Sequence, residues 1–182
     1  MEDLKSQPEA VSAQPPACPK NREFASIPEL YAAFQKELEG KQFSDPNGKV
    51  ATFRAEDFPH LVKLEFFDRK QNRWVDARAK AVIPQLQNGT FDEARYRIAD
   101  ASRPRTLFWI PEIIASPDST DPNRRNTRND VYAKRYRRKG SGATLKIVLV
   151  ETQPDGTRTV QTSFWSDDRY HANCVHKKMT PK

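Results

Sequence analysis

ATLKIVLVET at residues 143–152 and TRTVQTSFW at 157–165 flank Gln153-Pro154-Asp155-Gly156, and these stretches decide the fold class. Both runs alternate along much of their length and are rich in residues that favour β-strands. Proline, aspartate and glycine between them are typical of a tight turn. The pattern predicts an antiparallel β-hairpin.

The turn also predicts which residues of the hairpin face each other. A three-residue loop with Gly156 in the left-handed conformation closes with a residue pair at its two ends. The expected pairs are Gln153 with Thr157, Val150 with Val160, and Val148 with Thr162. The opposite face of the first strand then carries the residues that we expect in the core under the helices: Leu145, Ile147 and Leu149.

Upstream of the hairpin, apolar residues recur mostly with a helical period. Helical segments are expected from Ser26, a good N-cap, to Gly40, and then at 55–67, 74–87, 90–100 and 105–115. The segment 90–100 opens on a capping box, Thr90-Phe91-Asp92-Glu93. Strands are expected at 49–53 and 130–137. Helices followed by a meander predict an α+β fold, with N-terminal helices packed on a C-terminal antiparallel sheet of three or four strands.

Composition divides the chain into one domain and two tails. Residues 1–23 are dominated by Pro, Gln, Ser, Ala and Glu, so they are expected to be a disordered N-terminal tail. Residues 24–168 are expected to form a single domain, and 169–182 a polar C-terminal tail. A chain of 182 residues is long enough for one domain with such tails.

The sequence also argues against several classes of protein. No apolar run approaches the roughly 18 residues of a membrane helix, and the polar, acidic N-terminus is unlike a secretory signal. Two cysteines near opposite ends, Cys18 and Cys174, favour a reducing cytoplasm, with delivery into another cell left open. These cysteines and three histidines lack zinc-site spacing, and no metal or other cofactor is expected.

The net charge of +7 is concentrated in one stretch. Residues 122–146 hold nine basic side chains and one acidic one, a net of +8, which leaves −1 on the rest of the chain. Tyr132 and Tyr136 are interleaved with these charges. A basic stretch with aromatic residues is typical of a surface that binds phosphates and stacks bases. The alternatives are a solvated basic strand edge and a polybasic membrane patch, which lacks an adjoining apolar anchor.

The order of several short motifs resembles a known group of nucleases. The motifs are Phe58-Pro59-His60-Leu61, the segment 110–118 (IPEIIASPD), the segment 131–136 (VYAKRY), Leu145-Lys146-Ile147-Val148 and Thr162-Ser163-Phe164. Over about residues 49–168, this order resembles the phage-type branch of the barnase–EndoU–colicin–RelE-like nuclease superfamily. That resemblance implies helices followed by a curved antiparallel sheet. It also implies metal-independent ribonuclease activity, often in toxins or in phage and mobile-element proteins.

The resemblance implies roles for His60 in a helix, for Tyr132, Lys134 and Tyr136 in a strand, for Thr162 in the final strand and for Arg105 upstream. RNA cleavage through the 2′-OH needs a base, an acid and a cation that stabilises the phosphoryl oxygens. We expect four catalytic residues: His60, Lys134, Tyr136 and Thr162. We expect five further residues to bind RNA: Arg105, Tyr132, Arg135, Arg137 and Lys146.

Each of these residues also has a structural interpretation. A histidine at a helix start can simply bond to backbone, and tyrosines and threonine are ordinary strand residues. Strand parity also separates Tyr132, Lys134 and Tyr136 from Arg135 and Arg137. We favour the tyrosine and lysine face for the chemistry and place the arginines at its rim.

RNA is therefore the expected substrate, cleaved to a 2′,3′-cyclic phosphate. A toxin would also imply an acidic immunity or antitoxin protein as partner, and no membrane is expected to take part. Two alternatives remain open at this point: a nucleic-acid-binding module without catalysis, and a protein-interaction domain of a phage structural protein.

Overall fold

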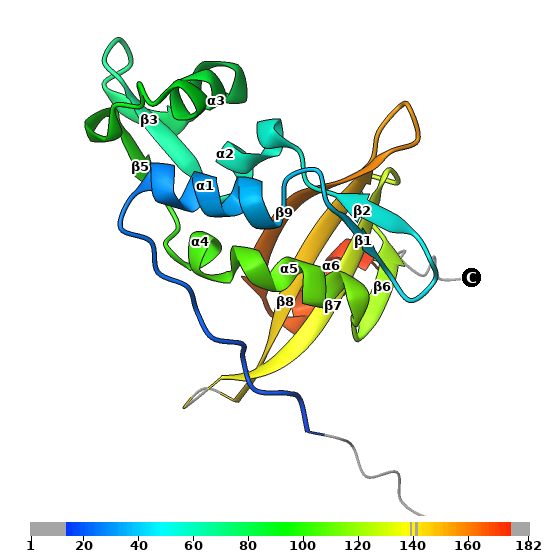
Figure 1. Cartoon of the computed structure of the whole chain (residues 1–182). Helices are drawn as coiled ribbons and strands as arrows, with labels where there is room; N and C mark the ends of the chain where they lie inside the picture. Colours follow the sequence, from blue (N-terminus) through cyan, green and yellow to red (C-terminus); the bar gives the residue numbers. More distant parts are fainter. Residues whose placement is uncertain (1–13, 139, 141, 176–182) are drawn as a thin grey trace, which may run out of the picture.

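The computed structural model describes residues 14–138, 140 and 142–175, and it confirms the α+β fold class. The predicted sheet of three or four strands is larger in the structure. A six-stranded curled sheet has the order β1-β2-β9-β8-β7-β6, and a separate three-stranded sheet has the order β4-β3-β5 (Figure 1). The larger sheet contains β1 (Gln42–Ser44), β2 (Val50–Thr52), β6 (Ser119–Pro122), β7 (Asn129–Arg138), β8 (Gly142–Thr152) and β9 (Arg158–Ser166).

The hairpin of β8 and β9 follows the predicted register only near its turn. The Gln153 backbone N–H donates to the Thr157 carbonyl at 2.7 Å, Gly156 has a φ of +84°, and Val150 faces Val160. An irregularity between Leu149 and Val150 then shifts the pairing. The final strand contributes one extra residue there, a β-bulge. Beyond it, the pairs are Leu149 with Thr162 and Val148 with Ser163.

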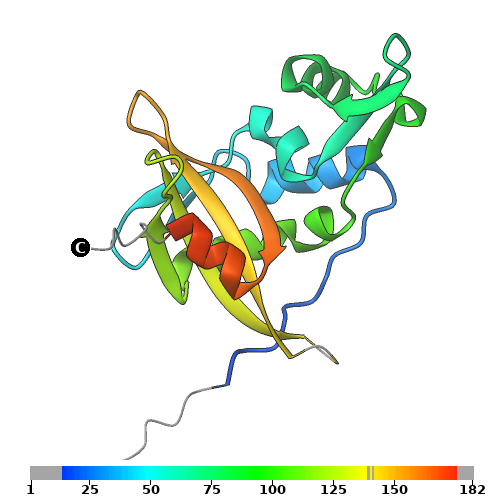
Figure 2. The same ribbon diagram turned by 180° about the vertical axis from the view of Figure 1, so that it is seen from behind.

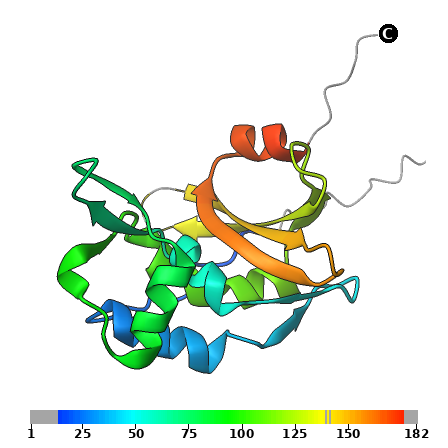
Figure 3. The same ribbon diagram turned by 90° about the horizontal axis from the view of Figure 1, so that it is seen from above.

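Helices cover both faces of the curled sheet. Helices α4 (Ser102–Thr106) and α5 (Ile110–Ala115) lie on one face, whereas α6 (Asp168–Val175) lies on the other (Figure 2). Figure 3 shows α6 and α1 (Ile27–Glu37) on opposite sides of the same sheet. The structure therefore has apolar clusters on both sides of the strands.

The predicted core face of β8 was wrong. Leu145 and Ile147 belong to the smaller cluster, which Leu149 and Val175 of α6 also join. The main core, under α1 and α5, instead receives Val148 and Val150. Alternation shows which residues share a face, but it does not show which helix will cover that face.

The first predicted helix is confirmed as α1. The Ser26 hydroxyl caps it by accepting from the Glu29 backbone N–H at 3.1 Å. The expected apolar stripe is buried in the main core: Leu30, Phe34 and Leu38. The aromatic side chains Phe53 and Phe58 contact Phe34 there.

The predicted helices at 55–67 and 74–87 are confirmed only in part, and most of the one predicted at 90–100 was wrong. A 3₁₀ turn (Ala55–Asp57) and one α-helical turn, α2 (Phe58–Leu61), are followed by β3 (Leu64–Asp68), because Lys63 adopts a left-handed φ of 56° that ends the helix. The segments that follow are β4 (Arg73–Asp76), α3 (Ala79–Asn88), a 3₁₀ turn (Glu93–Arg95) and β5 (Tyr96–Ile98).

The expected capping box fails because Glu93 has another partner. Its carboxylate accepts from the Ile27 backbone N–H at 2.7 Å, at the start of α1. The 105–115 segment is helical as expected, but a 3₁₀ turn (Leu107–Trp109) joins α4 to α5.

Part of each predicted tail lies on the folded domain. Residues 14–23, here called the N-terminal strap, contact the C-terminal end of β7 and the helices in front of the sheet (Figure 1). The Arg137 N–H donates to the Pro16 carbonyl at 2.8 Å, and Trp109 Nε1 donates to the Lys20 carbonyl at 3.3 Å. These hydrogen bonds use backbone groups, which composition does not reveal. Helix α6 likewise occupies the start of the expected C-terminal tail; residues 1–13 and 176–182 lie outside the described residues.

A buried hydrogen-bond network connects the turn between β1 and β2 to strands β7 and β9. The Tyr132 hydroxyl donates to Asp45 Oδ2 at 2.7 Å and accepts from Arg158 Nη2 at 2.8 Å. Burial opposes the charged form of Asp45, but hydrogen bonds from Tyr132 and two backbone N–H groups outweigh it and lower the pKa of Asp45.

Tyr132→Phe is expected to lower the free energy of unfolding by about 1–3 kcal/mol, since it leaves Oδ2 of the buried Asp45 carboxylate without its hydrogen-bond donor. Tyr136→Phe is the matched control, because both rings are buried on the same strand but Tyr136 donates to the half-exposed Glu112. Urea unfolding of both variants measures the difference. An equal loss in both variants would contradict a special role for the Asp45 network.

Candidate functional site

Three separate elements bring His60, Arg103 and Thr162 to one cavity. The cavity has a volume of about 610 Å³ and lies against the end of β9 and the start of α6. His60 comes from α2, Arg103 from α4 and Thr162 from β9. Phe164, Trp165 and Tyr170 are among the other residues that line it.

Arg103 joins the other two residues. Its Nη1 donates to the His60 carbonyl at 3.1 Å and to Thr162 Oγ1 at 3.1 Å. Its Nε lies 3.6 Å from Asp100 Oδ2 and has no hydrogen-bond partner among the described residues. A guanidinium held in this way places a fixed positive charge in the wall of the cavity.

The bulge in β9 decides where Thr162 points. Without it, Thr162 would pair with Val148 and face the main core. With it, Thr162 pairs with Leu149 and lines the cavity. A bulge beside a cavity is a common way to redirect a side chain.

His60 has a side chain that reaches solvent, and its pKa is below the usual value of 6.5. Partial desolvation by the surrounding protein is the largest cause, and the positive charges of Arg103 and Lys63 add to it. The imidazole is therefore mainly neutral at pH 7, which is the form that accepts a proton. His60 lies in the single turn of α2, which has Pro59 in its first turn and is followed by the left-handed residue Lys63.

Lys146, on β8, is fully buried. Its Nζ donates to Thr106 Oγ1 at 2.8 Å and lies 5.1 Å from the centre of the Trp165 ring. The pKa of Lys146 is lowered to about 7, chiefly by burial; the Asp100 carboxylate opposes this change and the Arg103 charge adds to it. The sequence predicted direct RNA binding by Lys146, but this side chain has no exposed surface in the structure.

Lys146→Met is expected to stabilise the fold at pH 7, since a similar apolar side chain replaces a buried charge. Thr106 keeps a hydrogen bond, because its hydroxyl also donates to the Ser102 carbonyl at 2.8 Å. Below pH 7 both folded and unfolded forms of the wild type carry the Lys146 charge. From pH 7 to the usual pKa of 10.5, only the folded state loses it.

The stability of the wild type should therefore rise with pH across that window, by up to about 1.4 kcal/mol per pH unit from this group. Lys146→Met should lack this component. Urea unfolding at pH 7, 8 and 9 measures the slope, and parallel slopes in the two proteins would contradict the assignment.

The other predicted catalytic residues lie elsewhere on the sheet, under α5. Lys134 Nζ donates to the Ser116 carbonyl at 2.5 Å, and the Tyr136 hydroxyl donates to Glu112 Oε1 at 3.1 Å. Burial and the Glu112 carboxylate raise the pKa of Tyr136. Burial raises the pKa of Tyr132 to about 12, so its phenol is protonated at pH 7. None of these three side chains lines the cavity around Arg103.

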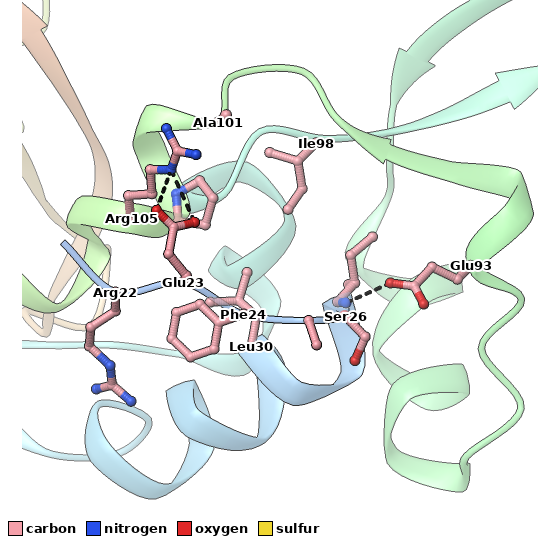
Figure 4. Close-up of a pocket in the computed structure, with 12 residues that line it drawn as sticks. Arg22, Glu23, Phe24, Ser26, Leu30, Glu93, Ile98, Ala101 and Arg105 are labelled. Atoms are coloured by element: carbon pink, nitrogen blue, oxygen red, sulfur yellow. Dashed lines mark hydrogen bonds and ion pairs between the residues drawn. The ribbon is translucent and has the colours of Figure 1, made fainter.

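The predicted RNA-binding arginines occupy separate places. Arg135 pairs with Asp168 of α6, and Arg137 Nη1 donates to Gln14 Oε1 at 2.8 Å in the N-terminal strap. Arg105 Nε lies 3.0 Å from Glu23 Oε1, beside a small cavity of about 240 Å³ between the strap, α1 and α4 (Figure 4). The basic stretch at residues 122–146 thus contains both buried and exposed charges. One of its lysines, Lys139, lies outside the described residues.

Sequence reasoning selected Arg105 and missed Arg103. Residues two apart in an α-helix point to nearly opposite sides. Arg103 and Arg105 therefore face different sides of α4, and no local pattern in the sequence marks which of them lies near His60. Only the packing of α4 against β9 decides which of them does so.

No group of three or more His, Cys, Asp or Glu side chains suited to a metal ion occurs among the described residues. In the same part of the chain, no helix is long and apolar enough to cross a membrane.

The fold and site define an α+β protein with a curled six-stranded sheet and a histidine–arginine–threonine cluster at its edge. Comparison with family models found no match, and comparisons with curated proteins and with solved structures found no significant match. Function must therefore be inferred from the residues of this chain and their geometry.

Proposed function

We propose that the protein is an endoribonuclease that cleaves RNA by attack of a ribose 2′-OH on the adjacent phosphate. The observation that carries this proposal is the double hydrogen bond from Arg103 to the His60 carbonyl and the Thr162 hydroxyl, at the wall of an open cavity. The cluster combines a neutral imidazole, a fixed cation and a hydroxyl. These groups match the needs of phosphodiester cleavage.

In the proposed reaction, His60 removes the proton from the 2′-OH. The 2′-oxygen forms a bond to phosphorus while the bond from phosphorus to the 5′-oxygen breaks. Arg103 and Thr162 stabilise the negative charge that builds on the nonbridging oxygens. The products are a 2′,3′-cyclic phosphate and a 5′-hydroxyl, and the leaving 5′-oxygen must gain one proton.

We assign that proton to the Tyr170 hydroxyl. Tyr170 lines the same cavity from α6, and its side chain is half exposed. Desolvation and the neighbouring Cys174 raise the pKa of Tyr170, so the phenol carries its proton at pH 7. After each turnover, the His60 imidazolium loses its proton to solvent and the Tyr170 phenolate regains a proton from solvent.

Tyr170→Phe is expected to lower the cleavage rate of RNA about 100-fold, the lower range for loss of a general acid. A phosphodiester with a p-nitrophenolate leaving group does not need that acid, so its cleavage rate should change little. Steady-state kinetics on both substrates checks the assignment. An equal loss on both would show that Tyr170 acts in another way.

The proposed activity is tested by incubating the purified protein with total tRNA and with a labelled single-stranded RNA in EDTA. Fragments that end in a cyclic phosphate are expected. Salt-dependent binding of both RNAs without cleavage would support the alternative, a nucleic-acid-binding module. Absence of both binding and cleavage would contradict either function.

A further inference from the structure

A second cavity adjoins the first and shares one wall with it. Its volume is about 300 Å³, and Trp165 lines both cavities. Helix α4 divides its side chains between them. Arg103 lines the first cavity, whereas Ser102, Arg105 and Thr106 line the second, as helical spacing requires.

The second cavity has the charge of an anion site. Arg105 and Arg138 line it, together with the polar side chains of Asn21, Ser102 and Thr106, and no carboxylate is among its lining residues. The Arg138 guanidinium carbon lies 5.1 Å from the centre of the Trp165 ring. Arginine on an aromatic wall is a recurrent way to hold a phosphate next to a base.

Arg105 is available to a ligand despite its ion pair with Glu23. The Arg105 side chain is 47% exposed and that of Glu23 is 70% exposed. Exposed pairs of this kind contribute at most about 1 kcal/mol. A phosphate that contacts Arg105 and Arg138 together can therefore displace the Glu23 carboxylate.

We propose that this second cavity binds the phosphate next to the scissile one in a single-stranded RNA, with Trp165 beside the nucleoside between the two phosphates. This inference rests on the proposed function, because it takes the first cavity as the place of the scissile phosphate. It assigns Arg105 and Arg138 to substrate binding. It also makes the substrate a strand longer than a dinucleotide, with its bases unpaired, since stacking on Trp165 requires a free base face.

The test compares an RNA dinucleotide with trinucleotides extended by one phosphate and nucleoside at either end. In the wild type, one of the two extensions should raise kcat/KM about 10-fold or more. In the double variant Arg105→Gln/Arg138→Gln, the ratio of kcat/KM for that trinucleotide to that for the dinucleotide should fall to near 1. The control Arg125→Gln/Arg128→Gln removes the same charge from exposed positions outside both cavities and should keep the wild-type ratio.

An unchanged ratio in the Arg105/Arg138 variant, or the same fall in the control, would overturn the inference. Failure of the proposed function has a different signature, since no RNA would then be cleaved by any variant. In that case, the affinities of the corresponding deoxyribonucleotides are compared instead. The gain in affinity from the added phosphate must still disappear in the Arg105/Arg138 variant and persist in the control, and any other result contradicts the subsite.

Discussion

His60→Ala is expected to lower the rate of RNA cleavage about 1,000-fold, in the middle of the range for loss of a general base. The imidazole is the proton acceptor of the proposed site, and its depressed pKa keeps it neutral at pH 7. The side chain is exposed, so its removal should leave the free energy of unfolding within about 0.5 kcal/mol of the wild type.

The pH profile gives an independent signature of His60. Because the base must be neutral, kcat/KM should rise with pH on the acidic side, with a midpoint below the usual histidine value of 6.5. His60→Ala should lack that limb. His171→Ala is the control, since this other described histidine lies on α6 and does not line the cavity. A His60→Ala protein with wild-type activity would eliminate the base assignment.

Arg103→Gln is expected to lower kcat/KM by about 100- to 1,000-fold, as for removal of a donor that stabilises transition-state charge. Arg103→Lys should recover only part of this loss, because a lysine cannot reproduce the geometry of a guanidinium with several donors. Arg97→Gln is the matched control. That arginine is ion-paired with Glu65 on the three-stranded sheet and lines neither cavity near Trp165.

A second readout distinguishes an electrostatic role of Arg103 from a structural one. The Arg103 charge helps to lower the pKa of His60. In Arg103→Gln, the acidic limb of the residual activity should therefore move to higher pH. A lower rate with an unmoved limb would show that the substitution acts by distorting the cavity.

The sequence was informative where local signals agree with tertiary packing. The turn with Gly156, the strands around it and the capped helix at Ser26 all follow from local geometry. His60 and Thr162, both singled out from the sequence, lie at the same cavity although they are about 100 residues apart in the chain.

Other parts of the site depend on long-range packing. The bulge that turns Thr162 toward the cavity arises inside a regular alternating strand, and no turn residue marks it. Arg103 was indistinguishable from Arg105 until the position of α4 was known. Lys134 and Tyr136 share a strand face with Tyr132, and for that reason the sequence favoured this face for the chemistry. In the structure, Lys134 donates to the Ser116 carbonyl just after α5, and Tyr136 donates to Glu112 within α5.

The three-stranded sheet was also beyond local reasoning. The segments around Phe67 and Trp74 have a helical spacing of apolar residues but also contain residues that favour strands. They form strands in the structure because β3 and β4 pair with each other, with Phe67 opposite Trp74. The N-terminal strap lacks a periodic pattern, since its bonds to β7 and Trp109 use backbone groups.

Attack by a ribose 2′-OH, the central claim, is tested most directly with four DNA strands that each contain one ribonucleotide, A, C, G or U, at the same position. We expect cleavage of at least one strand, only on the 3′ side of its ribonucleotide, with a 2′,3′-cyclic phosphate on one fragment and a 5′-hydroxyl on the other. The all-DNA strand should be bound but not cut. Cleavage of the all-DNA strand, or products with 5′-phosphate ends, would contradict the account.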